Sequence, residues 1–270
     1  MNPLEIVRRT PKSNCGECGF PTCLAFGAAV SATGTDPKRC PYLNLDNLEI
    51  EPVSINLEDP TRQRDLALVE HLKGKIADLN FKTLAPLLGA TLVGIAPDTL
   101  TFPFLGQKVL LSKTGILLDK QEPEDPRDQI LLYNYIASGG GRLLGGNWVG
   151  LESLPNSISK VRTLSVYSEA PLARLLVDAG RSEHLRNAIR LAGGIEQDSI
   201  SASQTYLFHV LPMVPQQVLF WAEEPEDGFE AKVKILFDQH VLDFLDIESL
   251  VFASERLAER LTALVKEPYP

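Results

Sequence analysis

The feature that most constrains this chain is the placement of its cysteines. All four lie between positions 15 and 40 of the 270 residues, at Cys15, Cys18, Cys23 and Cys40, in the spacing C-x2-C-x4-C-x16-C. Cysteines grouped this closely in a reducing compartment more often hold a metal than form disulfides. The sequence therefore predicts a small metal-binding segment near the N-terminus.

The residues around the first three cysteines favour a tight ligand loop followed by a helix. Gly16 and Gly19 can adopt the positive φ angles that such a loop often requires. Pro21 and Thr22 can then open a helix, which places Cys23 in its first turn. There the backbone N–H groups and the helix dipole stabilise a thiolate.

Two kinds of metal group are compatible with four thiolates. Structural zinc sites usually present two short cysteine pairs separated by a longer loop. Here three cysteines stand close together and the fourth stands alone, which suits a 4Fe–4S cubane better. Phe20, Leu24 and Phe26 can shield such a cluster from water. A four-cysteine zinc module with a structural or interaction role stays open as an alternative.

The cysteine segment resembles a known cluster domain. The run TPKSNCGECGFPTCLAFGAAV…CP is similar to the N-terminal domain of the large subunit of corrinoid iron–sulfur proteins, and a related motif occurs in the B subunit of Rnf-type electron-transport complexes. This resemblance implies that Cys15, Cys18, Cys23 and Cys40 are the ligands of a 4Fe–4S cluster.

A second resemblance covers residues 60–266, which are similar to an uncharacterised domain fused behind this motif in anaerobic bacteria and archaea. It rests on FLG at 104–106, on LLYNYIASG, on the stretch near Pro171 and on KILFD. That family brings no established activity. What the resemblance implies is the cytoplasm of an anaerobe.

Composition excludes several classes of function. With 44% hydrophobic and 23% charged residues, the chain is typical of a globular protein. The net charge of −9 argues against a nucleic-acid partner, whose phosphates require a basic surface. No apolar run is long enough to span a membrane, and MNPLEIVRRT lacks the apolar core of a secretory signal. We therefore expect a cytoplasmic protein without a membrane span.

The fold class predicted from the patterns is α+β, with a small helical cluster-binding domain followed by a larger domain of mainly antiparallel sheet and flanking helices. Leu66 to Leu79 carry apolar residues at helical spacing, and short apolar runs over 90–119 predict an antiparallel meander. Further helices are predicted at 126–138, 171–179, 182–192 and 247–265, and further strands at 205–211, 217–223 and 232–238.

Two domain boundaries follow from these patterns. We assign residues 1–45 to the cluster-binding domain and residues 61–270 to an α+β domain of unknown function. Residues 46–60 are acidic, contain prolines and predict a linker.

A glycine-rich segment is the next candidate site. The run SGGGRLLGGN from Ser138 could cradle a phosphate or let a cofactor approach the backbone. However, the segment follows a helix rather than a strand and matches neither the dinucleotide fingerprint nor the phosphate loop. A helix C-cap with a flexible turn is the alternative. The candidate cofactor-binding residues are Gly140, Gly141, Gly145 and Trp148.

The four histidines match no metal motif. His209 lies in an apolar strand, so we expect it in the core. His240 stands near Asp238, Asp243 and Asp246, which could form a cation site, although helix caps explain these carboxylates more simply.

Three functions remain open. Because every iron of a four-cysteine cubane has a protein ligand, we expect a one-electron relay to a redox partner protein or bound acceptor rather than a stand-alone catalyst. The second hypothesis is a redox enzyme whose larger domain binds a corrinoid, flavin or other small-molecule cofactor reduced by the cluster. The third is the zinc module.

Overall fold

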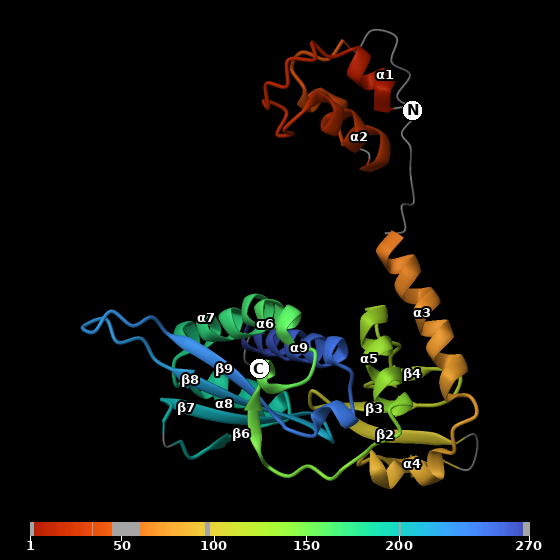
Figure 1. Ribbon diagram of the computed structural model, residues 1–270, viewed down its shortest axis with the longest axis vertical. Helices are drawn as coiled ribbons and strands as arrows, with labels where there is room; N and C mark the ends of the chain where they lie inside the picture. Colours follow the sequence, from red (N-terminus) through yellow and green to blue (C-terminus); the bar gives the residue numbers. More distant parts are fainter. Residues whose placement is uncertain (1–2, 34, 45–59, 95–97, 200, 267–270) are drawn as a thin grey trace. The chain divides into compact units, whose positions relative to one another are not determined.

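The computed structural model describes residues 3–33, 35–44, 60–94, 98–199 and 201–266. The chain divides into two compact units, residues 1–64 and 65–270, which are described separately (Figure 1). Almost all of the predicted linker lies outside the described residues. The domain boundaries at 45 and 60 therefore stay a prediction.

Two short helices and a loop build the first unit. Helix α1 (Pro3–Arg8) packs against α2 (Cys23–Thr33), and a single 3-10 turn, η1 (Pro37–Arg39), follows. The Thr22 hydroxyl caps α2 by accepting the N–H of Ala25 at 3.0 Å. The predicted helix that follows the cysteine loop is confirmed.

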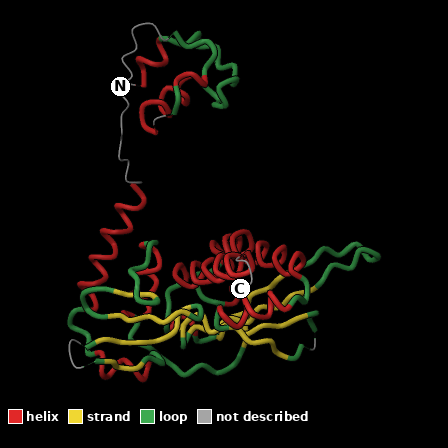
Figure 2. The backbone as a smooth tube through the Cα atoms, turned by 180° about the vertical axis from the view of Figure 1, so that it is seen from behind, coloured by secondary structure: helices red, strands yellow, loops and turns green. Residues whose placement is uncertain are grey.

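Two antiparallel sheets form the second unit (Figures 1 and 2). The first is the meander β1-β2-β3-β4, and the second has the order β5-β9-β8-β7-β6. All pairings are antiparallel, which confirms the predicted α+β class. The strands are β1 (Thr91–Val93), β2 (Thr99–Phe104), β3 (Gln107–Leu111), β4 (Ile116–Leu118), β5 (Trp148–Gly150), β6 (Gly194–Gln197), β7 (Gln204–Leu211), β8 (Val214–Trp221) and β9 (Lys232–Asp238).

Helices α4, α7, α8 and α9 of the second unit pack against these sheets. Helices α6, α7 and α9 lie together over one face of the five-stranded sheet (Figure 1). Every helix in the described part of the chain is too short or too polar to cross a bilayer. The helices are α3 (Pro60–Ile76), α4 (Phe81–Leu87), α5 (Pro126–Ala137), α6 (Ile158–Leu164), α7 (Ala170–Ala179), α8 (Glu183–Leu191) and α9 (Ile247–Lys266), with short turns η2 (Leu151–Ser153), η3 (Ser165–Glu169) and η4 (Val241–Asp243).

A buried tyrosine and a backbone hydrogen bond join the two sheets. The Tyr135 hydroxyl donates to the Leu88 carbonyl at 2.6 Å and accepts the N–H of Met213 at 3.2 Å. Beside it, the N–H of Leu105 donates to the Val210 carbonyl at 3.0 Å. These bonds satisfy backbone groups that the junction would otherwise leave buried without partners.

Gly106 makes the close approach at this junction possible. Its φ is +78°, and a Cβ there would overlap the Leu191 carbonyl. We therefore expect Gly106→Ala to lower the free energy of unfolding by roughly 2 kcal/mol, measured by guanidinium melts. Gly74 in α3 is the matched control, because a Cβ there meets nothing within 4 Å. Gly74→Ala should raise stability by about 0.5–1 kcal/mol, and equal losses in both variants would contradict this reading.

Two helices of the described chain, α4 and α6, were not predicted. Helix α4 was not predicted, because a proline, Pro86, lies within its sequence. Asn80 caps this helix by accepting the Lys82 N–H at 3.0 Å. The helix predicted at 171–179 is α7, and the unpredicted helix α6 precedes it and joins it through the π-turn η3. Pro171 has no N–H for the preceding turn, which accounts for the wider turn.

The predicted burial of two side chains was also wrong. Leu66 was expected on the buried side of its helix, but it is 40% exposed, whereas Val69 and Leu72 are buried. His209 was expected in the core and is exposed on β7. Both errors arise because periodicity marks an apolar side but does not show what covers it.

Candidate metal centre

The four cysteines lie in the first unit as free thiols, and their surroundings differ. Cys18 and Cys40 are each 8% exposed and pack in the small core with Ile6, Phe26 and Leu43. Cys23 is half-buried at the start of α2, and Cys15 is exposed. The domain therefore has two thiols in an apolar setting and one open to solvent.

The loop between the cysteines has the backbone conformation that its glycines predicted. Gly16 has a φ of +78° and Gly19 a φ of +85°. The N–H of Gly19 donates to the Gly16 carbonyl at 2.8 Å, which closes a tight turn around Cys18. Any residue with a Cβ would be strained at either glycine.

Polar groups of the preceding loop converge on Cys23. The backbone N–H of Asn14 lowers the pKa of the Cys23 thiol most, followed by the Thr10 hydroxyl and the Lys12 N–H. The Asn14 carboxamide oxygen also accepts the Cys23 N–H at 2.9 Å. Lys12 and Asn14 adopt positive φ angles of 57° and 52°, and the backbone N–H groups of both lower the pKa of this thiol. This arrangement favours the thiolate, the form that binds metal.

The return of the chain to Cys40 is fixed by local hydrogen bonds. Asp36 caps η1 by accepting the Lys38 N–H at 2.9 Å, and the Cys40 N–H donates to the Pro37 carbonyl at 3.2 Å. The N–H of Asn44 then donates to the Arg9 carbonyl at 3.2 Å. The fourth cysteine is therefore tied both to its own turn and to the end of α1.

The pKa of Tyr42 is affected by two of the cysteines. Its hydroxyl donates to a Glu17 carboxylate oxygen at 3.2 Å. This hydrogen bond raises the pKa of Tyr42, and the Cys15 and Cys40 thiols add smaller contributions in the same direction. Cys15 and Cys40 are thus both near this ring.

The predicted aromatic cover is confirmed only in part. Phe26 is fully buried, and its ring centroid lies 5.7 Å from that of Phe20. The Arg39 guanidinium lies 5.6 Å from the Phe20 ring centroid, a cation–π contact that the spacing of the motif did not indicate. Leu24, which was also expected to shield the site, is 54% exposed on the outer side of α2.

The donor set fits an iron–sulfur cluster in its chemistry. Four free thiols, backbone donors at one sulfur and an apolar wall are the elements such clusters use. Among the residues that the structure describes, no three His, Cys, Asp or Glu side chains are already arranged as a metal-binding group.

Three residues around Cys23 were not singled out from the sequence. Thr10, Lys12 and Asn14 contact it from a loop that carries no motif of its own. The one available signal was Asn14, because asparagine tolerates positive φ better than most residues.

The glycine-rich segment has structural contacts at most of its candidate positions. A Cβ at Gly140 would crowd Leu87, and one at Gly141 would overlap Asp243. Trp148 is half-buried as the first residue of β5, where it pairs with Asp238. None of the cavities described below is lined by Gly140, Gly141, Gly145 or Trp148. Cofactor binding by these residues stays a prediction.

The carboxylates near His240 have identifiable partners. Asp243 forms a two-pronged ion pair with Arg142, whose hydrogen bonds hold the pKa of Asp243 below its usual range. Asp238 accepts the Gly146 N–H at 2.7 Å, and Asp246 accepts the Ser249 N–H at 3.0 Å at the start of α9. These contacts agree with caps and loop anchors rather than with a cation site.

Both parts of the chain match known protein families. Residues 80–260 match the family described as "Domain of unknown function (DUF3786)". Residues 11–42, which include all four cysteines, match a model described as "Putative Fe-S cluster". The chain belongs to the DUF3786 family and carries an N-terminal iron–sulfur cluster domain of this type.

Curated relatives match only the cysteine segment. The corrinoid/iron-sulfur protein large subunit of Moorella thermoacetica is 49% identical over 44 residues, which are 16% of this chain and 10% of that protein. The acetyl-CoA decarbonylase/synthase complex subunit gamma of Archaeoglobus fulgidus is 38% identical over 58 residues, 22% of this chain and 12% of that protein. The chain therefore spans about a tenth of these relatives. No solved structure matches it.

These matches confirm the resemblance drawn from the cysteine motif and support iron–sulfur binding by the N-terminal segment. They also confirm that the larger part belongs to an uncharacterised domain family.

Proposed function

We propose that Cys15, Cys18, Cys23 and Cys40 bind one 4Fe–4S cluster and that the protein passes single electrons to a redox partner. The observation that carries the proposal is the set of four free thiols in a segment that matches an iron–sulfur domain. When bound, the cluster supplies a reversible one-electron couple.

The residues of the segment have distinct parts in this proposal. Asn14 and Lys12 direct backbone donors at the Cys23 sulfur, and such donors stabilise the added negative charge of a reduced centre. Phe26 with Cys18 and Cys40 keeps one side apolar, while the exposed Cys15 lies on the side open to a partner. Ligation of every iron by cysteine leaves none for a substrate, so transfer of electrons is favoured over catalysis at iron.

The DUF3786 unit then docks the partner or holds the electron acceptor. A corrinoid, flavin or similar cofactor bound to this unit is the second candidate function. The similarity of the N-terminal segment to the corrinoid/iron-sulfur protein large subunit of Moorella thermoacetica favours this candidate. We place the protein in the cytoplasm of an anaerobe, where such a cluster is protected from oxygen.

Spectroscopy of the anaerobically purified full chain tests the proposal. We expect a brown protein with about four irons per chain, whose visible absorbance bleaches on reduction with dithionite and which then gives a paramagnetic resonance signal. A colourless protein containing one zinc ion would instead establish the zinc module and exclude both redox functions. A second chromophore that remains with the larger unit would favour the enzyme over the relay.

A further inference from the structure

A small cavity beside α9 contains charged groups that the proposed electron transfer does not use. Its volume is about 240 Å³, and it lies between α9, the β2–β3 hairpin and the start of α5. Phe104, Leu118 and Ala263 give it an apolar wall, while Asp128 and Arg260 supply opposite charges. A cavity with one apolar and one charged side suits an amphipathic small molecule.

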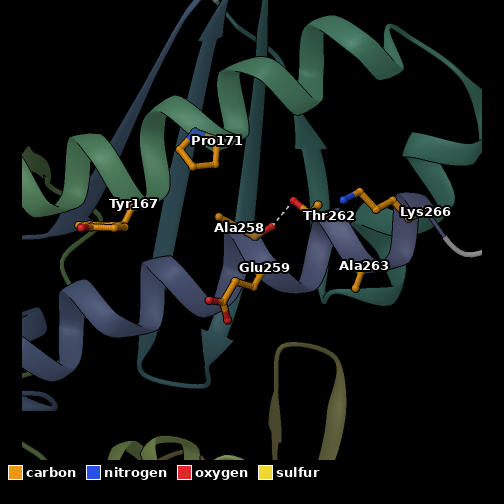
Figure 3. A pocket seen from close by; sticks show the side chains of 7 residues that line it. All are labelled: Tyr167, Pro171, Ala258, Glu259, Thr262, Ala263 and Lys266. Atoms are coloured by element: carbon orange, nitrogen blue, oxygen red, sulfur yellow. Dashed lines mark hydrogen bonds between the residues drawn. The ribbon is translucent and has the colours of Figure 1, made fainter. Parts of the chain in front are cut away.

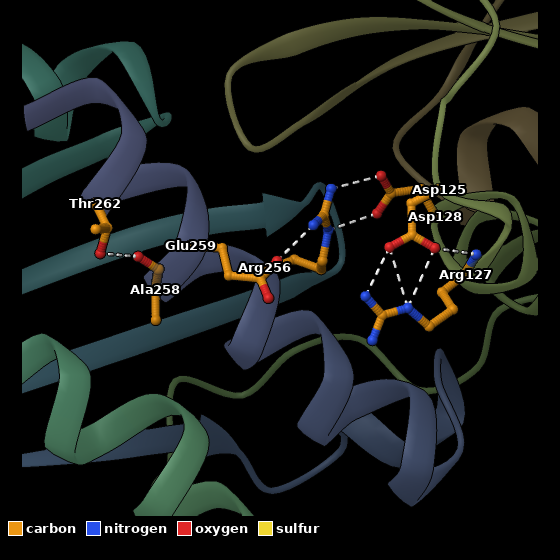
Figure 4. Close-up of polar contacts among 7 residues, drawn as sticks. All are labelled: Asp125, Arg127, Asp128, Arg256, Ala258, Glu259 and Thr262. Carbon is orange, nitrogen blue, oxygen red and sulfur yellow. Dashed lines mark hydrogen bonds and ion pairs between the residues drawn. The ribbon is translucent and has the colours of Figure 1, made fainter. Parts of the chain in front are cut away.

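Arg256, one of the two arginines that line this cavity, already forms ion pairs within the protein. The Arg256 guanidinium donates two hydrogen bonds to the Asp128 carboxylate, both at 2.7 Å, and a third to Glu259 (Figure 4). Asp128 is 3% exposed, so its charge is matched inside the protein by Arg256. Glu259 is 54% exposed, so solvent screens its charge at the rim.

The second arginine, Arg260, has an unpaired hydrogen-bond donor. The Arg260 Nε is buried and has no hydrogen-bond partner among the residues that the structure describes. An unpaired buried donor is costly, and a guanidinium is suited to two parallel hydrogen bonds with a carboxylate. Asp128 and Glu259 both form ion pairs with Arg256, so Arg260 is the lining cation whose charge no carboxylate among the described residues pairs with.

We propose that this cavity binds a small apolar monocarboxylate, with its carboxylate on Arg260 and its apolar body against Phe104, Leu118 and Ala263. A dianion such as phosphate is disfavoured, because Asp128 and the rim carboxylate of Glu259 would repel its second charge. The volume lies below the roughly 300–1,000 Å³ of sites for drug-sized ligands, so the acid is about the size of benzoate.

A second cavity next to α9 could accommodate the end of a longer acid. It has a volume of about 410 Å³ and an apolar lining that includes Tyr167 and Pro171 (Figure 3). The two cavities share Glu259 and Ala263. A longer acid therefore has an apolar surface on which to continue past Ala263.

Calorimetric titration of the full chain with sodium benzoate tests this site. We expect saturable one-to-one binding, and at least tenfold weaker binding of benzamide, which has the same ring but no charge. Arg260→Gln should weaken benzoate binding about tenfold or more, whereas Arg190→Gln on the surface of α8 should leave it unchanged. Ala263→Phe, at an exposed position, should block the cavity without disturbing the core.

The proposal is overturned if the wild-type protein gives no saturable heat with benzoate, or if benzamide binds equally well. Unchanged benzoate affinity in Arg260→Gln or in Ala263→Phe would also overturn it. If Arg260→Gln does not fold, the comparison of benzoate with benzamide and the Ala263→Phe variant still decide the question. None of these measurements depends on the metal content of the protein.

Discussion

Cys23→Ser is expected to abolish or degrade the metal centre, with loss of most of the iron and of the visible absorbance from the anaerobically purified protein. Serine is a poor ligand for iron in such clusters, and Cys23 is the thiol whose pKa is lowered by Asn14, Thr10 and Lys12. Iron analysis and the visible spectrum measure the effect. The larger unit should still unfold at its normal denaturant concentration, because it contains no cysteine.

Ser31→Ala is the matched control for this variant. Ser31 lies on the same helix, and its hydroxyl donates to the Gly27 carbonyl at 2.8 Å, so the change removes one local hydrogen bond and no thiol. It should keep full iron content. A Cys23→Ser protein with unchanged iron and spectrum would show that this cysteine is not a ligand, and simultaneous unfolding of the larger unit would refute the predicted domain boundary.

The second large effect is expected at the ion pair between α5 and α9. Arg256→Met leaves the Asp128 carboxylate buried without its partner, and we expect a loss of roughly 3–5 kcal/mol of unfolding free energy. Arg127→Met is the control, because Arg127 pairs with Asp125 where it is 47% exposed. That change should cost no more than about 1 kcal/mol in the same denaturant melts.

The loss in Arg256→Met should depend on pH. Burial raises the pKa of Asp128 even with Arg256 in place, and removal of the guanidinium raises it further. A carboxyl group whose pKa is raised by folding destabilises the protein most above that raised pKa, and the penalty disappears as pH falls below it. The variant should therefore be closest to wild type in mildly acidic buffer. A deficit that grows on acidification would contradict this assignment.

Much of the architecture followed from local patterns. The cysteine spacing with Gly16 and Gly19 predicted the loop, and the alternation of short apolar runs with turn residues predicted the meander of β1 to β4. The prediction failed where a local cue conflicts with tertiary packing. Pro86 made the sequence of helix α4 look non-helical, and His209 lies in an apolar strand but its side chain is exposed in the fold.

The polar contacts could not be predicted, because they join residues far apart in the sequence. Arg256 lies 128 positions from Asp128, and no periodicity relates the two. The same is true of Arg142 and Asp243, whose ion pair anchors the glycine-rich segment to η4. Such pairs appear only when helices and loops from distant segments pack together.

By itself, the sequence determined the metal chemistry proposed here, since four cysteines in a short segment define a thiolate donor set whatever the remainder of the chain does. The tertiary structure decided which donors surround Cys23 and which thiols are covered, because these depend on the return of the loop before α2. It also decided where the larger unit has room for a ligand. The cavity beside α9 and its unpaired Arg260 donor arise from packing between segments that no local pattern connects.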